Sequence, residues 1–198
     1  MADDLRLQTA AVSFRQRFLV GSKRLIFVTG PQGSGKSSRC EEFVSLARAY
    51  GIPTGGILSI PVFDSGTKVA IELLDVSTGV SRRFARRHDA GDADVGRWKL
   101  EDGALEWANG VLRRAAGSEI LLVDELGPME LLRAEGFVDG VKALDNGGYA
   151  LALAVVRPEL IRLALERWPH GEVVDVGRNR RALARLIGSR IFANSLIR

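Results

Sequence analysis

The feature that most constrains the fold is a glycine-rich segment, residues 30–37, with the pattern G-x-x-x-x-G-K-S. The apolar residues 25–28 precede it, and residues 40–50 behind it have helical spacing. Such a loop binds phosphate when a strand lies behind it and a helix N-terminus lies in front, because backbone N–H groups and the helix dipole then meet the anion. The segment therefore predicts a Walker A phosphate loop in an α/β domain, in preference to a glycine-rich turn that binds nothing.

The positions of this loop have distinct expected roles. Lys36 should reach the β- and γ-phosphates of a nucleotide and contribute to catalysis, and the Ser37 hydroxyl should ligate Mg²⁺. Glycine permits the backbone to wrap the phosphates without a Cβ in the way. The candidate nucleotide-binding residues are Gly30, Pro31, Gln32, Gly33, Ser34, Gly35, Lys36, Ser37 and Ser38.

A short apolar run that ends in two acids, residues 120–125, predicts the second half of the site. Asp124 is the expected Walker B residue, which holds Mg²⁺ through a water or through Ser37. Glu125 is expected to polarise the attacking water and to accept its proton. The alternative is an acidic pair that only caps a strand end in solvent. The Walker A loop earlier in the same chain favours the catalytic interpretation.

Composition fits one globular domain. The chain has 198 residues, of which 46% are hydrophobic and 26% charged, which is ordinary for a protein with one core. A net charge of +4 is mild, so nucleic acid is not required as a partner. The single cysteine, Cys40, is expected to be a buried structural thiol, and a chain without an internal disulfide agrees with a cytoplasmic location. No apolar run reaches the length of a membrane span.

Apolar runs and helical spacings alternate along the chain, which implies a mostly parallel sheet with helices on both faces. Residues 68–75 and 80–86, joined by a turn that ends in glycine, predict an inserted β-hairpin. The other expected strands are residues 24–29, 56–60, 120–124, 149–156 and 172–176. The expected helices are residues 4–19, 35–50, about 105–115, about 137–146, the segment from Pro158 to Trp168, and 180–198.

The string D-E-L-G-P-M-E-L at residues 124–131 resembles the signature of the small P-loop nucleoside-triphosphatases first described in thermophiles, also called the cancer-related nucleoside-triphosphatase family. Weaker matches are Gly55-Gly56, residues 95–98 and residues 179–180, so that the resemblance runs from about residue 24 to about residue 186. It implies a RecA-like fold of the additional-strand class. It also implies Mg²⁺-dependent hydrolysis of several nucleoside triphosphates, here by Lys36, Ser37, Asp124 and Glu125.

Two departures from the family pattern stand out. Family members usually start at the first strand, so residues 1–22 are expected to be an N-terminal extension to a domain of residues 23–198, with a protein partner as one possible use. The second strand of the family commonly continues into a polar, often acidic tail, whereas residues 59–62 here are Ser-Ile-Pro-Val. If that tail places substrate or water, turnover is expected to be weak or the substrate different.

Further polar residues are candidates for the same edge of the sheet. Arg157 ends the strand expected beside Walker B and could stabilise transition-state charge on the γ-phosphate, or could be a surface residue before Pro158. Arg180 follows the last strand with Arg178 and Asn179 and could flank the base, although Asn179 would also cap a helix. Glu130 is expected in the first turn of a helix that starts at Pro128. There it would cap the helix, support the attacking water or Glu125, or do both.

The sequence thus predicts a Mg²⁺-dependent hydrolase of ATP, GTP, CTP and UTP. Base discrimination should be small, because no N-K-x-D guanine motif is present. Two alternatives stay open: a nucleoside or nucleotide kinase with the hairpin as a lid, and a regulatory nucleotide-binding module of low turnover that docks a partner through residues 1–22. Glu125 beside Asp124 favours water as the acceptor over a second nucleotide.

Overall fold

The structure is a computed structural model that describes Val12 and residues 23–88 and 97–178. The expected helices 4–19 and 180–198, most of the polar loop after residue 87, and the candidates Asn179 and Arg180 lie outside the described residues. The elements are β1 (Arg24–Thr29), α2 (Lys36–Ala49), β2 (Thr54–Asp64), β3 (Thr67–Asp75), β4 (Ser81–Arg87), β5 (Trp98–Leu100), α3 (Ala104–Ala115), β6 (Ile120–Leu126), η1 (Met129–Arg133), α4 (Val138–Asn146), β7 (Leu151–Val156), η2 (Pro158–Leu160), α5 (Ile161–Arg167) and β8 (Glu172–Asp175).

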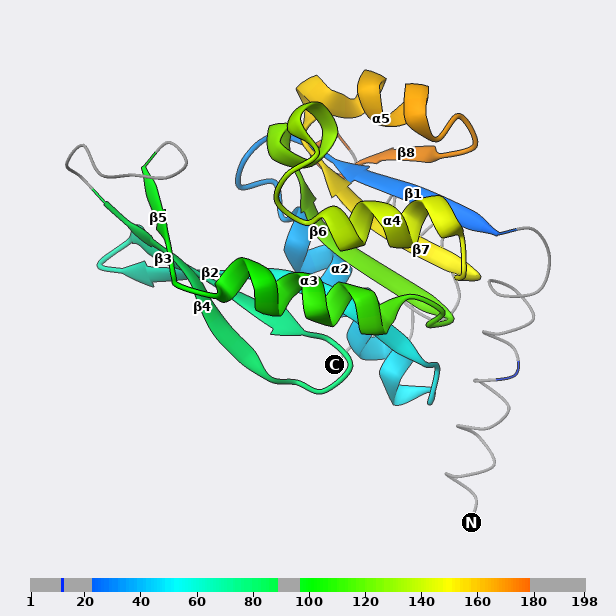
Figure 1. The fold of residues 1–198 in the computed structure, drawn as a ribbon, viewed down its shortest axis with the longest axis horizontal. Coiled ribbons are helices and arrows are strands. Elements are labelled where there is room, and N and C mark those ends of the chain that lie inside the picture. Colours follow the sequence, from blue (N-terminus) through cyan, green and yellow to red (C-terminus); the bar gives the residue numbers. More distant parts are fainter. Residues whose placement is uncertain (1–11, 13–22, 89–96, 179–198) are drawn as a thin grey trace, which may run out of the picture.

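The strands within the described residues form one mixed sheet with the order β5-β4-β3-β2-β6-β7-β1-β8 (Figure 1). Strands β2, β6, β7, β1 and β8 pair in parallel. Their apolar runs are continuous because both faces of a parallel sheet are covered. Strand β7 lies between β1, which leads into the phosphate loop, and β6, which ends in the acidic pair. This inserted strand confirms the additional-strand arrangement that the resemblance implied.

The other half of the sheet is antiparallel and confirms the expected hairpin, since β3 pairs with β4 over residues 70–74 and 81–86. Strand β2 is longer than expected, and the short β5 was not expected at all. The expected strand covered residues 56–60 and so ended just before Pro61. The strand continues to Asp64 because β6 pairs only with residues 54–57, so beyond that point one side of β2 needs no N–H.

Helices cover both faces of the sheet, as expected from the alternation of strands and helices. Figure 1 shows α3, α4 and α5 on one face and α2 on the other. Successive residues of β1 divide between the two cores: Leu25 and Phe27 pack towards α3 and α4, and Ile26 and Val28 pack towards α2. Cys40 is fully buried on the α2 side, and burial raises the pKa of its thiol, which confirms a structural cysteine. No helix in residues 23–88 and 97–178 could cross a membrane.

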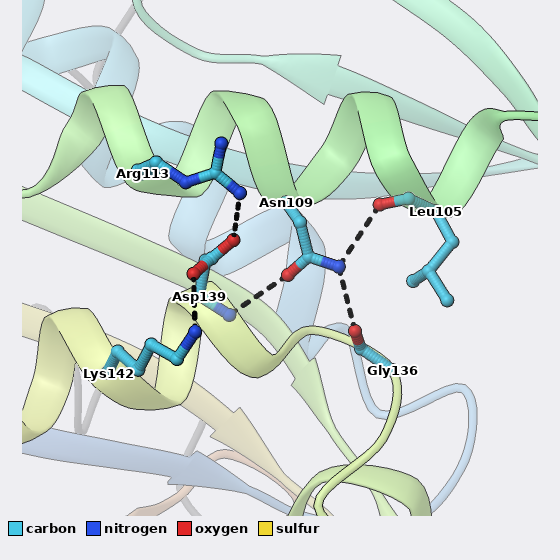
Figure 2. Close-up of polar contacts among 6 residues, drawn as sticks. All are labelled: Leu105, Asn109, Arg113, Gly136, Asp139 and Lys142. Atoms are coloured by element: carbon cyan, nitrogen blue, oxygen red, sulfur yellow. Dashed lines mark hydrogen bonds and ion pairs between the residues drawn. The ribbon is translucent and has the colours of Figure 1, made fainter.

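A polar network joins α3 to the start of α4 (Figure 2). The Asn109 side chain donates to the carbonyl oxygens of Leu105 and Gly136 at 3.1 and 2.9 Å and accepts the Asp139 N–H at 2.9 Å. The Asp139 carboxylate in turn accepts bonds from Arg113 and Lys142, which hold its pKa below the usual value despite burial. Asn109 is thus the residue that satisfies the backbone where the chain enters α4.

Asn109→Ala should lower the free energy of unfolding by about 1–3 kcal/mol, because the Asp139 N–H and the Gly136 carbonyl lose their partner. The matched control is Arg113→Ala on the same helix. The side chain of Arg113 is 71% exposed, so losing its ion pair should cost about 1 kcal/mol or less. Denaturant unfolding measures both variants. A larger loss for Arg113→Ala than for Asn109→Ala would contradict this account of the network.

Candidate functional site

The phosphate loop leaves β1 and enters α2 through glycines with a left-handed backbone. Gly33 and Gly35 have φ angles of 77° and 88°, which side chains with a Cβ rarely adopt. The Lys36 ammonium donates to the carbonyl oxygens of Gly30 and Pro31 at 2.8 and 3.1 Å, so it lies back across the loop. The Ser34 hydroxyl inside the loop is buried and makes no hydrogen bond to a described residue. Ser37 and Ser38 lie in the first turn of α2.

The end of β6 brings Asp124 to the first turn of α2. Asp124 is 1% exposed, and its carboxylate accepts a hydrogen bond from the Ser37 hydroxyl and one from the Ser59 N–H at 3.0 Å. Burial raises the pKa of Asp124 to about 6, although the two hydrogen bonds and Lys36 oppose the rise. The structure thus places the expected metal ligands Ser37 and Asp124 in contact, although they are far apart in the sequence.

Ser59 is a site residue that the sequence analysis did not recognise. Its hydroxyl donates to the Asp124 carbonyl at 2.7 Å, and its N–H donates to the Asp124 carboxylate. These two bonds continue the contact between β2 and β6 after their regular pairing ends at Ile57 and Val123. The available signal was a polar residue in an apolar strand, at the position where the family pattern departs.

Glu125 and Arg157 form an ion pair between the ends of β6 and β7. Arg157 Nε lies 2.5 Å from Glu125 Oε1, and the side chains are 49% and 31% exposed. Although burial opposes it, this carboxylate and those of Glu159 and Glu130 raise the pKa of Arg157. The expected water-activating group and the expected transition-state cation therefore lie side by side. Arg157 is also an exposed residue before Pro158, so both interpretations of it stay open.

Glu130 stabilises an unusual conformation of the residues that follow the Walker B strand, where an ordinary helix start was expected. Residues 129–133 form a π-helical turn, and the buried Glu130 carboxylate accepts the N–H groups of Gly127 and Phe137 at 2.8 and 3.0 Å. A Cβ on Gly136 would stand 2.0 Å from Glu130 Oε1, so only glycine permits this close approach. Glu130 thus caps both ends of the turn, and its charge also acts on Arg157.

Other basic residues are held outside this centre. Arg83 and Arg86 pair with Glu72 and Glu101 on the antiparallel half of the sheet. Arg178 lies nearer the phosphate loop, because Asp175 accepts its backbone N–H at 3.2 Å and pairs with its side chain. The backbone at Gly177 touches the loop at Gly30 and Pro31. The end of β8 therefore flanks the phosphate loop, and a contact of Arg178 with the base stays a prediction.

Lys68, on β3, was also missed. Its ammonium lies 5.0 Å from the centre of the Trp98 ring. Burial lowers its pKa, and the charges that act on it are those of Glu125, Asp124 and Arg157. Lys68 follows the turn between β2 and β3, and the sequence gives no sign of its relation to the acidic pair, because that relation depends on the unexpected length of β2.

Ser37 and Asp124 are suited to a Mg²⁺ site in which water and the phosphates of a bound nucleotide supply the remaining ligands. Within the described part of the chain, no group of three or more histidine, cysteine or acidic side chains is placed so that it could hold a metal ion. Mg²⁺ needs no such cage, because it keeps waters and substrate phosphates and takes only one or two protein oxygens. The contacting Ser37 hydroxyl and buried Asp124 carboxylate offer that pair.

Comparison with known proteins defines the family. A family model described as NTPase matches residues 25–187. The chain belongs to this nucleoside-triphosphatase family. It is similar to the nucleoside-triphosphatase THEP1 of Methanopyrus kandleri, with 30% identity over 78% of this chain and 81% of that protein. It is also similar to the THEP1 protein of Methanothermobacter thermautotrophicus, with 29% identity over 82% of this chain and 93% of that protein.

Mammalian proteins of the nucleoside-triphosphatase family are similar as well. A mouse cancer-related nucleoside-triphosphatase homologue is 26% identical over 61% of this chain and 68% of its own length. The solution structure of a human cancer-related nucleoside triphosphatase shares the fold, with a TM-score of 0.64 and 21% identity over 88% of this chain and 99% of that one. These findings confirm the family, the fold and the enzyme class that the sequence predicted.

Asp124→Asn should raise the stability of the unliganded protein by about 1–3 kcal/mol at neutral pH, because folding buries a charge whose pKa rises to about 6. The matched control is Asp139→Asn, a buried carboxylate whose pKa is lowered by its partners, so that its neutralisation should destabilise. Thermal or denaturant unfolding without nucleotide measures both. Changes of the same sign in the free energy of unfolding of the two variants would contradict the conclusion that the buried charge of Asp124 destabilises the unliganded fold.

Proposed function

We propose that the protein hydrolyses nucleoside 5'-triphosphates to diphosphates and phosphate with Mg²⁺ and with little preference for the base. One observation carries the proposal. The loop that can hold the phosphates and the acidic pair that can act on water lie at one edge of the sheet, joined by the contact of Ser37 with Asp124. Family membership supports the same chemistry.

The phosphate loop would bind the substrate through its backbone N–H groups and Lys36. In the described structure Lys36 donates to two loop carbonyl oxygens. Phosphate oxygens are stronger acceptors because they are charged, so they would replace these carbonyl oxygens as partners of the ammonium. None of these donors would distinguish one nucleotide base from another. Ser37 and Asp124 would hold Mg²⁺, which when bound neutralises charge on the phosphate oxygens.

Glu125 is the residue proposed to orient water and accept its proton. Oε1 of Glu125 accepts a hydrogen bond from Arg157 Nε, and Oε2 would then be the oxygen that orients the water. The guanidinium of Arg157 lies beside the Glu125 carboxylate, from where it would stabilise charge that develops on the transferred phosphoryl group. Water as acceptor distinguishes this proposal from a kinase, which transfers the phosphoryl group to a second substrate and does not release it as phosphate.

Glu125→Gln should retain binding of the Mg²⁺–triphosphate and lower the rate of phosphate release about 10²–10⁴-fold, the usual cost of losing a general base. The matched control is Glu159→Gln. Glu159 is exposed, and its charge also raises the pKa of Arg157. It follows β7 and does not lie at the end of β6 beside Asp124, so its variant should keep the parent rate. Steady-state phosphate release without any acceptor is the measurement. Parental turnover by Glu125→Gln would refute the role of Glu125.

Hydrolysis of ATP, GTP, CTP and UTP should give specificity constants within about two orders of magnitude of one another. A phosphate loop is blind to the base, and steep selectivity requires polar groups that pair with one base edge. Competition between the four triphosphates tests this directly. A preference above about 10⁴-fold for one of them would reveal a dedicated base pocket and overturn the proposed breadth.

A further inference from the structure

The antiparallel half of the sheet brings a lysine towards the reactive end of the site. Strand β2 runs on past Ser59, whose N–H contacts Asp124, and turns into β3 at residues 64–67. Lys68 pairs with Phe63 near this turn. In Figure 1 the far end of the hairpin and β5 extend on the side of the sheet where the phosphate loop leaves β1.

Lys68 is a half-buried cation with no carboxylate in contact among the described residues. The acids of the antiparallel half have other partners: Glu72 binds Arg83, Glu101 binds Arg86, and Asp64 accepts the Ser65 hydroxyl. Trp98 supplies the face of its ring at 5.0 Å, which attracts an ammonium and holds it in one place. Burying an ammonium costs free energy unless an anion offsets the loss of water, so a phosphate beside Lys68 would be bound favourably.

The charges that act on Lys68 are those of the candidate site. Glu125 and Asp124 attract it and Arg157 repels it, which places Lys68 within electrostatic range of the ends of β6 and β7. The phosphate loop with Lys36 lies at the end of β1, which β7 separates from β6. A triphosphate that extends from the loop towards Glu125 would therefore lead its terminal phosphate towards Lys68.

We propose that Lys68 binds the terminal phosphate of the nucleotide from the hairpin side, opposite Lys36, and so makes the site distinguish triphosphate from diphosphate. This inference rests on the proposed function, because it assumes that the phosphate loop holds the substrate. A diphosphate ends at the β-phosphate and lacks the group that Lys68 would contact. Lys68 should therefore contribute to affinity for the substrate and not to affinity for the product.

The test compares two ligands in one variant. Lys68→Met keeps a long apolar side chain against Trp98 and removes the charge. Affinity for a non-hydrolysable ATP analogue with Mg²⁺ should fall about 10- to 100-fold, the worth of a charge-assisted contact, whereas affinity for ADP with Mg²⁺ should change less than about threefold. Lys68→Arg should restore most of the loss. Lys99→Met, an exposed lysine next to Trp98, is the matched control and should bind both ligands like the parent.

The outcomes separate this inference from the proposed function. An unchanged affinity for the ATP analogue, or an equal loss for ADP, in a Lys68→Met protein with parental circular dichroism would overturn the role of Lys68. If that happens while the parent hydrolyses ATP, only the inference fails. If the parent binds neither ligand and releases no phosphate, the proposed function fails as well.

Discussion

The site depends on the parallel pairing of β7 with two neighbours at once. Leu151 lies opposite Arg24 of β1 and Ile120 of β6, and the same register continues to Val28 in β1 and to Val123 in β6, after which the β6 register shifts before Leu126. Because parallel strands end at one edge, this shared register sets the phosphate loop and the acidic pair at matched heights. The ion pair of Glu125 with Arg157 and the contact of Ser37 with Asp124 both span elements that β7 aligns. A slip of β7 by one residue would turn its side chains to the opposite face and separate these groups.

The buried carboxylates that stabilise the fold differ from the buried carboxylate of the site in the direction of their pKa shifts. Asp75, Glu130 and Asp139 accept bonds from donors that the fold itself supplies, at a hairpin turn, a π-helical turn and a helix start. The pKa values of Asp75 and Asp139 are lowered accordingly. Asp124 is as deeply buried, yet its pKa rises, because its two hydrogen bonds do not offset the loss of water. Such a carboxylate weakens the unliganded fold and is suited to a cation that arrives with the substrate.

The sequence predicted those parts of the fold and of the site that depend on short, local patterns. The loop at residues 30–37, the strand that ends at Asp124 and the hairpin of β3 and β4 each have such a pattern. Ser59 and Lys68 do not, because their relation to Asp124 exists only once β2 has paired with β6 and continued past it. The π-helical turn was missed because Pro128 suits any helix start, whereas the partner of Glu130 at Phe137 lies beyond the turn. The catalytic roles stay predictions.

The central claim is that the phosphate loop holds the triphosphate through Lys36, and one binding measurement tests it most directly. Titration calorimetry of the parent and of Lys36→Ala with a non-hydrolysable ATP analogue and Mg²⁺ should show that the variant loses most of its affinity. The half-exposed ammonium bonds only to loop carbonyl oxygens in the described structure, so the midpoint of thermal unfolding without nucleotide should change little. Unchanged affinity in the folded variant would contradict the account.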